Sequence, residues 1–255
     1  MSLVLDRPVW SALATCHASL AEGGALARRY PASIAPFAAP ADDGAASLAA
    51  FASLAGESDR VLMIEAGPIR LPPMLIATTR AMGVQMVLDR PATGVQDARI
   101  ERLGDSDSAE MVALAALTRP GPFTLRARAL GTFWGIREAG RLVAMAGERF
   151  HQPGHVELSG VCTHPGVQGQ GLGRLLSLFV AGVIQARGEV PYLHAYEANA
   201  RAIALYEALG FRMRCRMHVA AVERAATIER GKSGSTAGDG LADRGAAQAS
   251  VRHER

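Results

Sequence analysis

The chain has 255 residues and a formal net charge of +3; 49% of its residues are hydrophobic and 5% are aromatic. This length fits one large domain or two small ones, and this apolar content supplies a core. The start, MSLVLDRPVW, has no basic segment followed by an apolar one, and no window holds about 18 uninterrupted apolar residues, so we expect a cytoplasmic protein with neither leader nor membrane span.

The cysteines and the basic residues argue against two further classes. Cys16, Cys162 and Cys215 are odd in number, far apart and outside any Cys-x-x-Cys pattern, so neither a disulfide framework nor a metal site is expected. Lys232 is the only lysine, and the arginines are scattered without interleaved aromatic residues. Such a distribution does not favour a nucleic-acid-binding surface.

Residues 1–95 are predicted to form a separate N-terminal unit. Helical spacing predicts helices over 9–20 and 45–54, an apolar run predicts a buried strand over 59–65, and 74–88 is ambiguous between helix and strand. We interpret this unit as an accessory α/β domain, because no catalytic spacing occurs in it. Our hypothesis is that it packs on the domain that follows and shapes the substrate site there.

A polar break at 89–94, which contains Pro91 and Gly94, separates this unit from a second domain over 96–222. The first half of that domain is predicted to hold a strand, a helix, a short helix or loop, and two further strands, at 98–103, 105–117, 124–130, 132–137 and 141–150. The turn between the last two is short, which predicts antiparallel pairing. Residues 223–255 are rich in Gly, Ser and Ala with mixed charge, a composition typical of a disordered tail.

The central stretch is HVELSGVCTHPGVQGQGLGR, residues 155–174. It is predicted to be a strand that ends at His164-Pro165, followed by the glycine-rich loop 168–173 and an amphipathic helix over 172–187. Backbone N–H groups at such a helix N-terminus favour a phosphate, and glycines let the ligand approach and allow positive φ. The spacing is neither that of the nucleotide-triphosphate loop nor Gly-x-Gly-x-x-Gly.

A second pattern follows near the end of the domain. A strand is predicted over 190–196, then a helix over 199–209 and a last strand over 211–219. Asn199 is a good N-cap for this helix, and Gly210 stands where a left-handed residue ends it. The pattern therefore reads Asn-x-x-x-x-x-x-Tyr-x-x-x-Gly-Phe, with Tyr206 in the middle of the helix.

These two patterns resemble the signatures of the GCN5-related N-acetyltransferases, the GNAT superfamily. The first is Gln-x-x-Gly-x-Gly, entered from a strand that ends in Val-x-x-x-Pro, here Val161 to Pro165. The resemblance implies an α/β (α+β) fold with a mixed, mostly antiparallel central sheet flanked by helices. It also implies transfer of an acetyl or other acyl group from acetyl-CoA (coenzyme A) to an amine, with no metal.

The resemblance also implies which residues hold the coenzyme. It implies that the pyrophosphate is bound by the loop and the first helical turn, that is by Gln168, Gly169, Gln170, Gly171, Leu172, Gly173 and Arg174. It implies that the pantetheine arm is bound by the edge of the preceding strand, at Val161, Cys162 and Thr163, and by Asn199. The N–H of Val161 would face the thioester carbonyl, while the Cys162 side chain points to the other face as a small core residue.

For the general base, the resemblance implies Glu157, eleven positions before Gln168. With a period of two, Glu157 shares a strand face with Ser159 and Val161. Desolvation among apolar strand residues can raise its pKa toward neutrality. Glu148, Glu197 and a chain of water molecules stay open as alternatives, whereas His155 and His194 are interpreted as structural.

For the general acid, the resemblance implies Tyr206, with core packing beside Ile203 as the alternative. Phe123 and Trp134 belong to the region that borders the acceptor in relatives, so a partly apolar cleft is expected. Expected partners are a small-molecule, amino-acid or peptide amine and no nucleic acid or membrane; a homodimer stays open. The alternative function is a non-catalytic acyl-CoA sensor.

Overall fold

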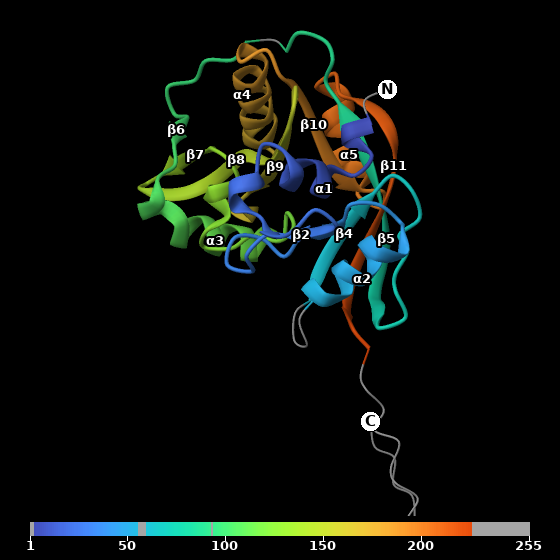
Figure 1. Ribbon diagram of the computed structural model, residues 1–255. Helices are drawn as coiled ribbons and strands as arrows, with labels where there is room; N and C mark the ends of the chain where they lie inside the picture. Colours follow the sequence, from blue (N-terminus) through green and yellow to red (C-terminus); the bar gives the residue numbers. More distant parts are fainter. Residues whose placement is uncertain (1–2, 56–59, 93, 226–255) are drawn as a thin grey trace, which may run out of the picture. The chain divides into compact units, whose positions relative to one another are not determined.

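One mixed sheet of eight strands organises residues 3–55, 60–92 and 94–225, which are the residues that the computed structural model describes (Figure 1). All neighbouring strands run antiparallel except β9 and β10, which are parallel. In sheet order the strands are β4 (Val61–Glu65), β11 (Arg212–Arg224), β5 (Leu75–Val87), β10 (Val190–Tyr196), β9 (His155–Thr163), β8 (Arg141–Gln152), β7 (Phe133–Glu138) and β6 (Glu101–Arg102). The expected mixed, mostly antiparallel sheet flanked by helices is confirmed.

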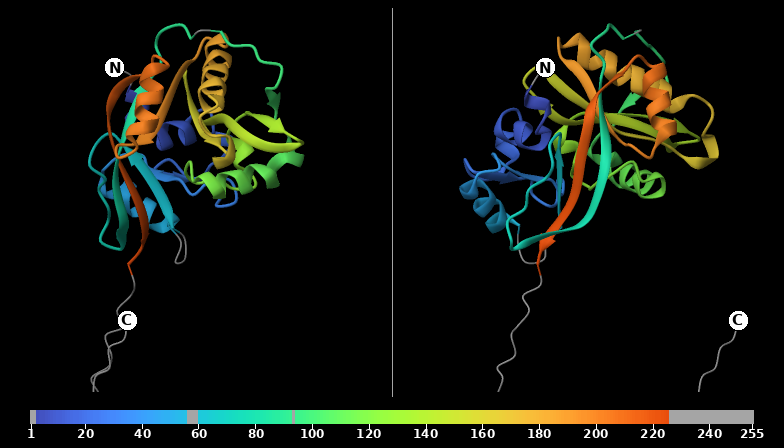
Figure 2. Two further views of the ribbon diagram at one scale, coloured as in Figure 1. Left: turned by 180° about the vertical axis from the view of Figure 1, so that it is seen from behind. Right: turned by 90° about the vertical axis from the view of Figure 1, so that its right-hand side faces the viewer.

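Helices cover both faces of this sheet (Figure 2). α4 (Leu172–Ala186) and α5 (Ala200–Ala208) share a core with Val156 and Leu158 of β9 and Leu193 of β10. α1 (Pro8–Ala14) packs with Tyr192, which alternates with Leu193 and therefore lies on the opposite face. The remaining elements are α2 (Ala45–Leu54), α3 (Ser108–Thr118), the small sheet β1 (Glu22–Gly23), β2 (Ala27–Arg29) and β3 (Ala38–Pro40), and the 3-10 turns η1 (Leu3–Leu5), η2 (Ala18–Leu20), η3 (Asp105–Asp107), η4 (Ala127–Leu130) and η5 (Pro165–Val167).

The parallel pair β9 and β10 stays together for only three residue pairs. Val190 to Tyr192 pair with His155 to Glu157, and beyond Tyr192 the strand β10 keeps only its pairing with β5, on its other edge. Beyond this point β9 contains a bulge at Gly160, whose φ is +63° and whose added Cβ would lie 2.8 Å from the Phe133 ring. A residue other than glycine would be strained there on both counts. The two strands consequently separate beside Leu158 and Leu193.

The sheet crosses the boundary that the sequence predicts at residue 95. β4 and β5 precede that boundary, and both pair with β11 near the end of the chain. The ambiguous stretch 74–88 is thus a strand in the middle of the sheet, and residues 1–225 fall into one compact unit. Of the predicted tail, residues 223 and 224 belong to β11, whereas 226–255 lie outside the described residues.

Two elements are shorter than the sequence predicts. The helix expected over 9–20 ends at Ala14, because Thr15 leaves helical geometry and a 3-10 turn follows. Of the strand expected over 98–103, only Glu101 and Arg102 pair with β7.

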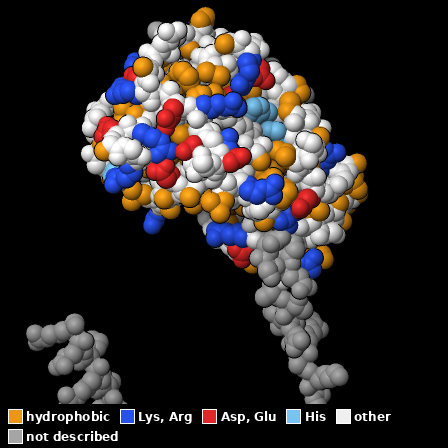
Figure 3. Space-filling model, turned by 90° about the vertical axis from the view of Figure 1, so that its left-hand side faces the viewer, with side chains coloured by type: hydrophobic (Ala, Val, Ile, Leu, Met, Phe, Trp, Pro, Cys, Tyr) orange, Lys and Arg blue, Asp and Glu red, His pale blue; other side chains and the backbone are white. Residues whose placement is uncertain are grey.

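No helix of the described chain has the length and apolar content of a membrane span. On the face shown in Figure 3, arginines and acidic side chains are interspersed.

Candidate active site

The glycine loop has the backbone geometry that its sequence predicts. Gly169 and Gly171 both have positive φ, +87° and +78°, and a Cβ at either position would point into open space. Gly171 is the N-cap of α4 and makes no side-chain cap, and the first helical bond runs from Leu175 N to Gly171 O. The amides of residues 172–174 precede that bond, so α4 begins with N–H groups that a phosphate would accept from. Gln168 donates from Nε2 to Thr163 O at 3.4 Å, which closes the loop.

A central cavity lies where β9 and β10 separate. We use this name for the hollow lined by Leu158 to Val161 of β9 and His194 to Tyr196 of β10. Tyr206 and Asn199 line it from α5 and its N-cap. Since Val161 borders the cavity and packs against the α4 core, the edge of β9 reaches from the glycine loop into this hollow.

Tyr206 is 9% exposed and stands in α5, with its ring edge-on to Phe211 at 5.8 Å. Burial, with smaller effects of Cys162 and Glu157, raises the pKa of Tyr206 to about 12. The phenol therefore keeps its proton at neutral pH, which suits a proton donor. Asn199 caps α5 as predicted, because its Oδ1 accepts from Ala202 N at 3.1 Å.

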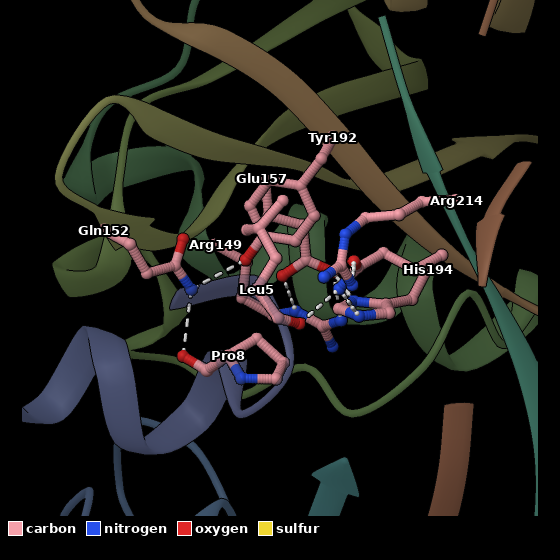
Figure 4. A network of polar contacts seen from close by, with 9 residues as sticks. Leu5, Pro8, Arg149, Gln152, Glu157, Tyr192, His194 and Arg214 are labelled. Carbon is pink, nitrogen blue, oxygen red and sulfur yellow. Dashed lines mark hydrogen bonds and ion pairs between the residues drawn. The ribbon is translucent and has the colours of Figure 1, made fainter. Parts of the chain in front are cut away.

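Glu157 is not placed as the sequence predicts. The bulge at Gly160 breaks the period of two, so Val161 packs with Leu158 on the α4 face while Glu157 faces the opposite side. There Glu157 is 1% exposed; Arg149 donates to its oxygens at 2.7 and 2.5 Å, and His194 Nδ1 lies 2.8 Å away (Figure 4). The expectation of a raised pKa is wrong: burial acts in that direction, but the charges and hydrogen bonds of Arg149 and His194 outweigh it and lower the pKa to about 2.

The other ring nitrogen of His194 is also engaged. Gln85 Nε2 lies 3.0 Å from His194 Nε2, and the Gln85 amide is oriented by Leu5 O at 2.9 Å and by Arg214 at 2.8 Å (Figure 4). This orientation has Gln85 donating to Nε2, so the His194 proton sits on Nδ1 and points to Glu157. Both nitrogens of His194 and both oxygens of Glu157 are thus engaged by protein groups.

Arg149 is a functional candidate that the sequence analysis missed. Its guanidinium lies over the rings of Phe37 and Phe150, 5.0 and 4.6 Å from their centroids, and its side chain is 14% exposed. It lines the central cavity and also a side cavity, by which we mean the adjoining hollow bordered by Phe123, Phe133 and Ile34. The signal in the sequence was an arginine soon after the apolar run 142–146, facing a glutamate of the next strand across a tight hairpin.

The two residues expected at the acceptor cleft lie apart. Phe123 lines the side cavity and meets Phe133 edge-on at 5.3 Å. Trp134 instead packs in the α4-side core, edge-on to Phe179 at 5.8 Å, and borders neither cavity. Pro120, Gly121 and Pro122 border both hollows, as their place beside Phe123 indicates.

The two alternative bases, and also Cys162, have protein partners. Glu148 is 2% exposed in its side chain and bonds Arg187 at 2.7 Å, and Glu197 pairs with Arg216 at 2.7 Å. Cys162 is buried in the core beside α3, where burial raises the pKa of its thiol to about 11 despite a hydrogen bond with Thr118. A thiol of that pKa is a weak nucleophile at neutral pH.

N-terminal residues border the same cavities. Phe37, Leu62 and Ile64 line the central cavity, and Ile34 with Ala35 lines the side cavity. They reach it because β4 joins the sheet beside β11, and because Phe37 forms a bridge with Leu62 of β4. The part of the chain without a catalytic spacing thus contributes one wall of the candidate site.

A crystal structure from Novosphingobium aromaticivorans, assigned to the GNAT family of acetyltransferases, is 40% identical in sequence and superposes with a TM-score of 0.83. The match covers 88% of this chain and 100% of that one. The chain belongs to the GNAT family. The motifs at 168–173 and 199–211 on which the resemblance was based are therefore those of a true member.

Two further comparisons agree with membership of the GNAT family. The model of the FR47-like proteins matches residues 133–219, which contain β7 to β10, α4, α5 and part of β11. A GCN5-related N-acetyltransferase from Kribbella flavida shares the fold, with a TM-score of 0.59 at 15% identity over 86% of this chain and 96% of that one. No curated protein matches the sequence.

Proposed function

We propose that this GNAT protein transfers an acetyl or similar acyl group from acetyl-CoA to a primary amine of a small molecule, amino acid or peptide. The amine attacks the thioester directly while both substrates are bound. One observation carries the proposal: Val161 of β9 and Tyr206 of α5 line the same cavity, at the point where β9 and β10 separate. The cavity can thus hold a thioester between a backbone donor and a phenol.

The donor substrate is proposed to lie along β9. The amides of Gly169 to Arg174 would bind its pyrophosphate, because they stand at the start of α4 with positive φ at two glycines. The pantetheine arm would pair with the β9 backbone at Val161 to Thr163 and with Asn199. One aligned N–H, that of Val161, would stabilise the oxyanion by about 2–4 kcal/mol.

The leaving thiolate is proposed to take its proton from Tyr206. The C–N bond forms as the C–S bond breaks, so the sulfur receives the electron pair and needs a proton. Tyr206 borders the cavity and remains a phenol at neutral pH, since burial raises its pKa to about 12. General acid catalysis of this kind contributes about 10²–10⁴-fold.

The amine proton is proposed to leave through water rather than to Glu157. Glu157 is bonded by Arg149 and His194, which help lower its pKa to about 2, so it is a poor base at neutral pH. Its role is to position Arg149 and His194, both of which line the cavity. A bound ammonium near Arg149 is disfavoured by like charge, which lowers the amine pKa and favours the nucleophilic form.

The experiment that tests this function is release of coenzyme A from acetyl-CoA against a panel of small amines, amino acids and peptides. Saturable, amine-dependent release together with an acetylated product supports the transferase. Tight binding of acetyl-CoA without release across the panel would favour the acyl-CoA sensor instead. Thermal stabilisation by coenzyme A, measured in parallel, separates a chain that does not bind the donor from one that binds it without turnover.

A further inference from the structure

We infer that the acceptor carries a carboxylate as well as its amine, and that Arg149 binds this carboxylate with help from Arg119 at the cavity rim. This inference rests on the proposed function and names the class of acceptor: an amino acid or a related amino-carboxylic acid. It is argued from the charges that face the two cavities.

The charge of the central cavity is one-sided. Arg119 and Arg149 line it, and no aspartate or glutamate lies among its lining residues within the described chain. In the side cavity the acidic lining residue is Glu148, whose carboxylate is bonded by Arg187 at 2.7 Å and approached by Thr132 N at 3.4 Å. A ligand that carried only a cationic amine would find no unpaired carboxylate here, whereas an anionic group would find the guanidinium of Arg119 and the edge of the Arg149 guanidinium that Glu157 does not bind.

Arg149 is built as a fixed anion receptor. Arg149 donates from Nε and Nη2 to Glu157 along one edge of its guanidinium group. The rings of Phe37 and Phe150 hold the plane of that group. The other hydrogen bonds that its five N–H groups could form have no acceptor among the described residues. The edge formed by Nη1 and Nη2 is therefore available, and it is the edge that binds a carboxylate with two parallel bonds. Little side-chain entropy is lost when such a prearranged group binds.

Arg119 adds a second charge at the mouth. It ends α3 in the left-handed conformation, with φ of +52°, and begins the segment Arg119-Pro120-Gly121-Pro122 that borders the cavity. No ion pair or hydrogen bond holds its exposed side chain within the described residues. The segment is stiffened by two prolines, so the charge stays close to the entrance.

These arginines are not placed to bind the coenzyme pyrophosphate. The loop residues 168–174 do not line either cavity, and Arg149 lies on the wall that Phe37 and Ile64 share. The two cationic groups therefore belong to the acceptor end of the cavity. Two functions, donor binding and acceptor binding, can be separated by mutation.

The test compares matched acceptors that differ only in the carboxylate: amino acids and their carboxamides, with coenzyme A release measured at saturating acetyl-CoA. We expect kcat/KM to be about 10–100-fold higher for the acid of the preferred pair, the effect of one charge-assisted bidentate contact. Arg119→Gln should lower the acid-to-amide ratio several-fold. Arg80→Gln, an exposed arginine of β5 away from both cavities, is the control and should leave the ratio unchanged.

For Arg149 the double variant Arg149→Gln/Glu157→Gln removes both buried charges together, so that neither is left unpaired. It should bring the ratio close to one while the Michaelis constant for acetyl-CoA changes less than twofold. Equal or better turnover of the amides by the unmodified protein overturns the inference and leaves the proposed function intact. A double variant that loses affinity for acetyl-CoA but keeps the acid-to-amide ratio also overturns the inference.

If no amine is turned over, calorimetry with the free acids and amides in the presence of coenzyme A decides. Binding of the acids alone supports the anion site although the transferase fails, and equal binding of acids and amides overturns it.

Discussion

Arg149 and Glu157 face each other across the β8–β9 hairpin, with Arg149 Nε 2.7 Å from Glu157 Oε2 and Arg149 Nη2 2.5 Å from Oε1. Glu157 is almost fully buried, whereas the Arg149 side chain keeps 14% of its surface exposed. A buried ion pair of this geometry is costly to form but more costly to break. The pair therefore fixes a positive group at the cavity wall and removes a carboxylate from the chemistry.

The first prediction concerns Glu157→Gln. Because the pKa of Glu157 is about 2, its titration cannot produce an acid limb near neutral pH. The pH profile of kcat/KM above about pH 5 should thus keep the position of its acid limb in the variant, even if the rate falls. An acid limb that disappears or moves by a unit or more would make Glu157 the base after all.

The same substitution should lower stability, with a defined pH dependence. Arg149 is left without its partner, so the free energy of unfolding at pH 7 should fall by about 3–5 kcal/mol in urea titrations. A carboxylate whose pKa is lower in the folded protein than its usual value of 4.5 stabilises the folded state fully at pH values above 4.5. This contribution is lost as the pH falls toward 2. The difference in the free energy of unfolding between the unmodified protein and the variant should thus shrink below about pH 4.5. A difference that grows there would contradict the ion-pair account.

Tyr206→Phe removes the phenolic hydroxyl and retains the ring that packs on Phe211. Turnover should fall about 10²–10⁴-fold, as expected for loss of a proton donor. Affinity for acetyl-CoA, measured by calorimetry, should stay within about threefold. Ile203→Val, a change on the same helix away from the cavity lining, serves as the control. A Phe variant with undiminished turnover removes Tyr206 from the reaction.

Gly171→Ala places a Cβ on a residue with φ of +78° at the start of α4. The left-handed conformation costs an alanine about 1–2 kcal/mol, so the loop should rearrange and coenzyme A affinity should drop about tenfold or more. Gly182→Ala in the middle of the same helix is the matched control, because its φ is ordinary and its Cβ meets nothing. That control should be stabilising by about 0.5–1 kcal/mol and neutral for binding. Equal effects of the two substitutions would contradict a role for the loop conformation.

A fragment of residues 96–222 tests the role of the N-terminal part. It lacks β5, which lies between β11 and β10, and β4, which covers the other side of β11. We expect the fragment to be insoluble or unfolded by circular dichroism. Soluble, folded material with unchanged acceptor kinetics would rule out both the structural role and the contribution of Phe37 and Ile64 to the acceptor wall.

Much of the second half of the fold could be predicted because its signals are local. The hairpin at Ala139-Gly140, the glycine loop and the Asn199 cap each depend on residues within a few positions, and each has the expected geometry. The central place of β5 could not be predicted in this way, since its partners are more than a hundred residues away. Sequence pattern alone left that stretch ambiguous between helix and strand.

The candidate site shows the same division. The donor loop and Tyr206 follow from motifs, whereas Arg149, Phe37 and His194 are brought together only by the tertiary fold. The misplacement of Glu157 has one local cause, the bulge at Gly160, which changes the face of every later residue in β9. A single glycine inside a strand pattern was the available sign of that bulge.

The central claim is that the amides at the start of α4 bind the pyrophosphate of an acyl-CoA whose thioester reaches the cavity beside Tyr206. Amide chemical shifts followed by ¹H–¹⁵N NMR during titration with acetyl-CoA test it most directly. The account predicts large, saturable shifts at Gly169 to Arg174 and at Val161, with small shifts in α1 and α2. Saturable binding that leaves the amides of 169–174 unmoved, or no binding at all, would contradict it.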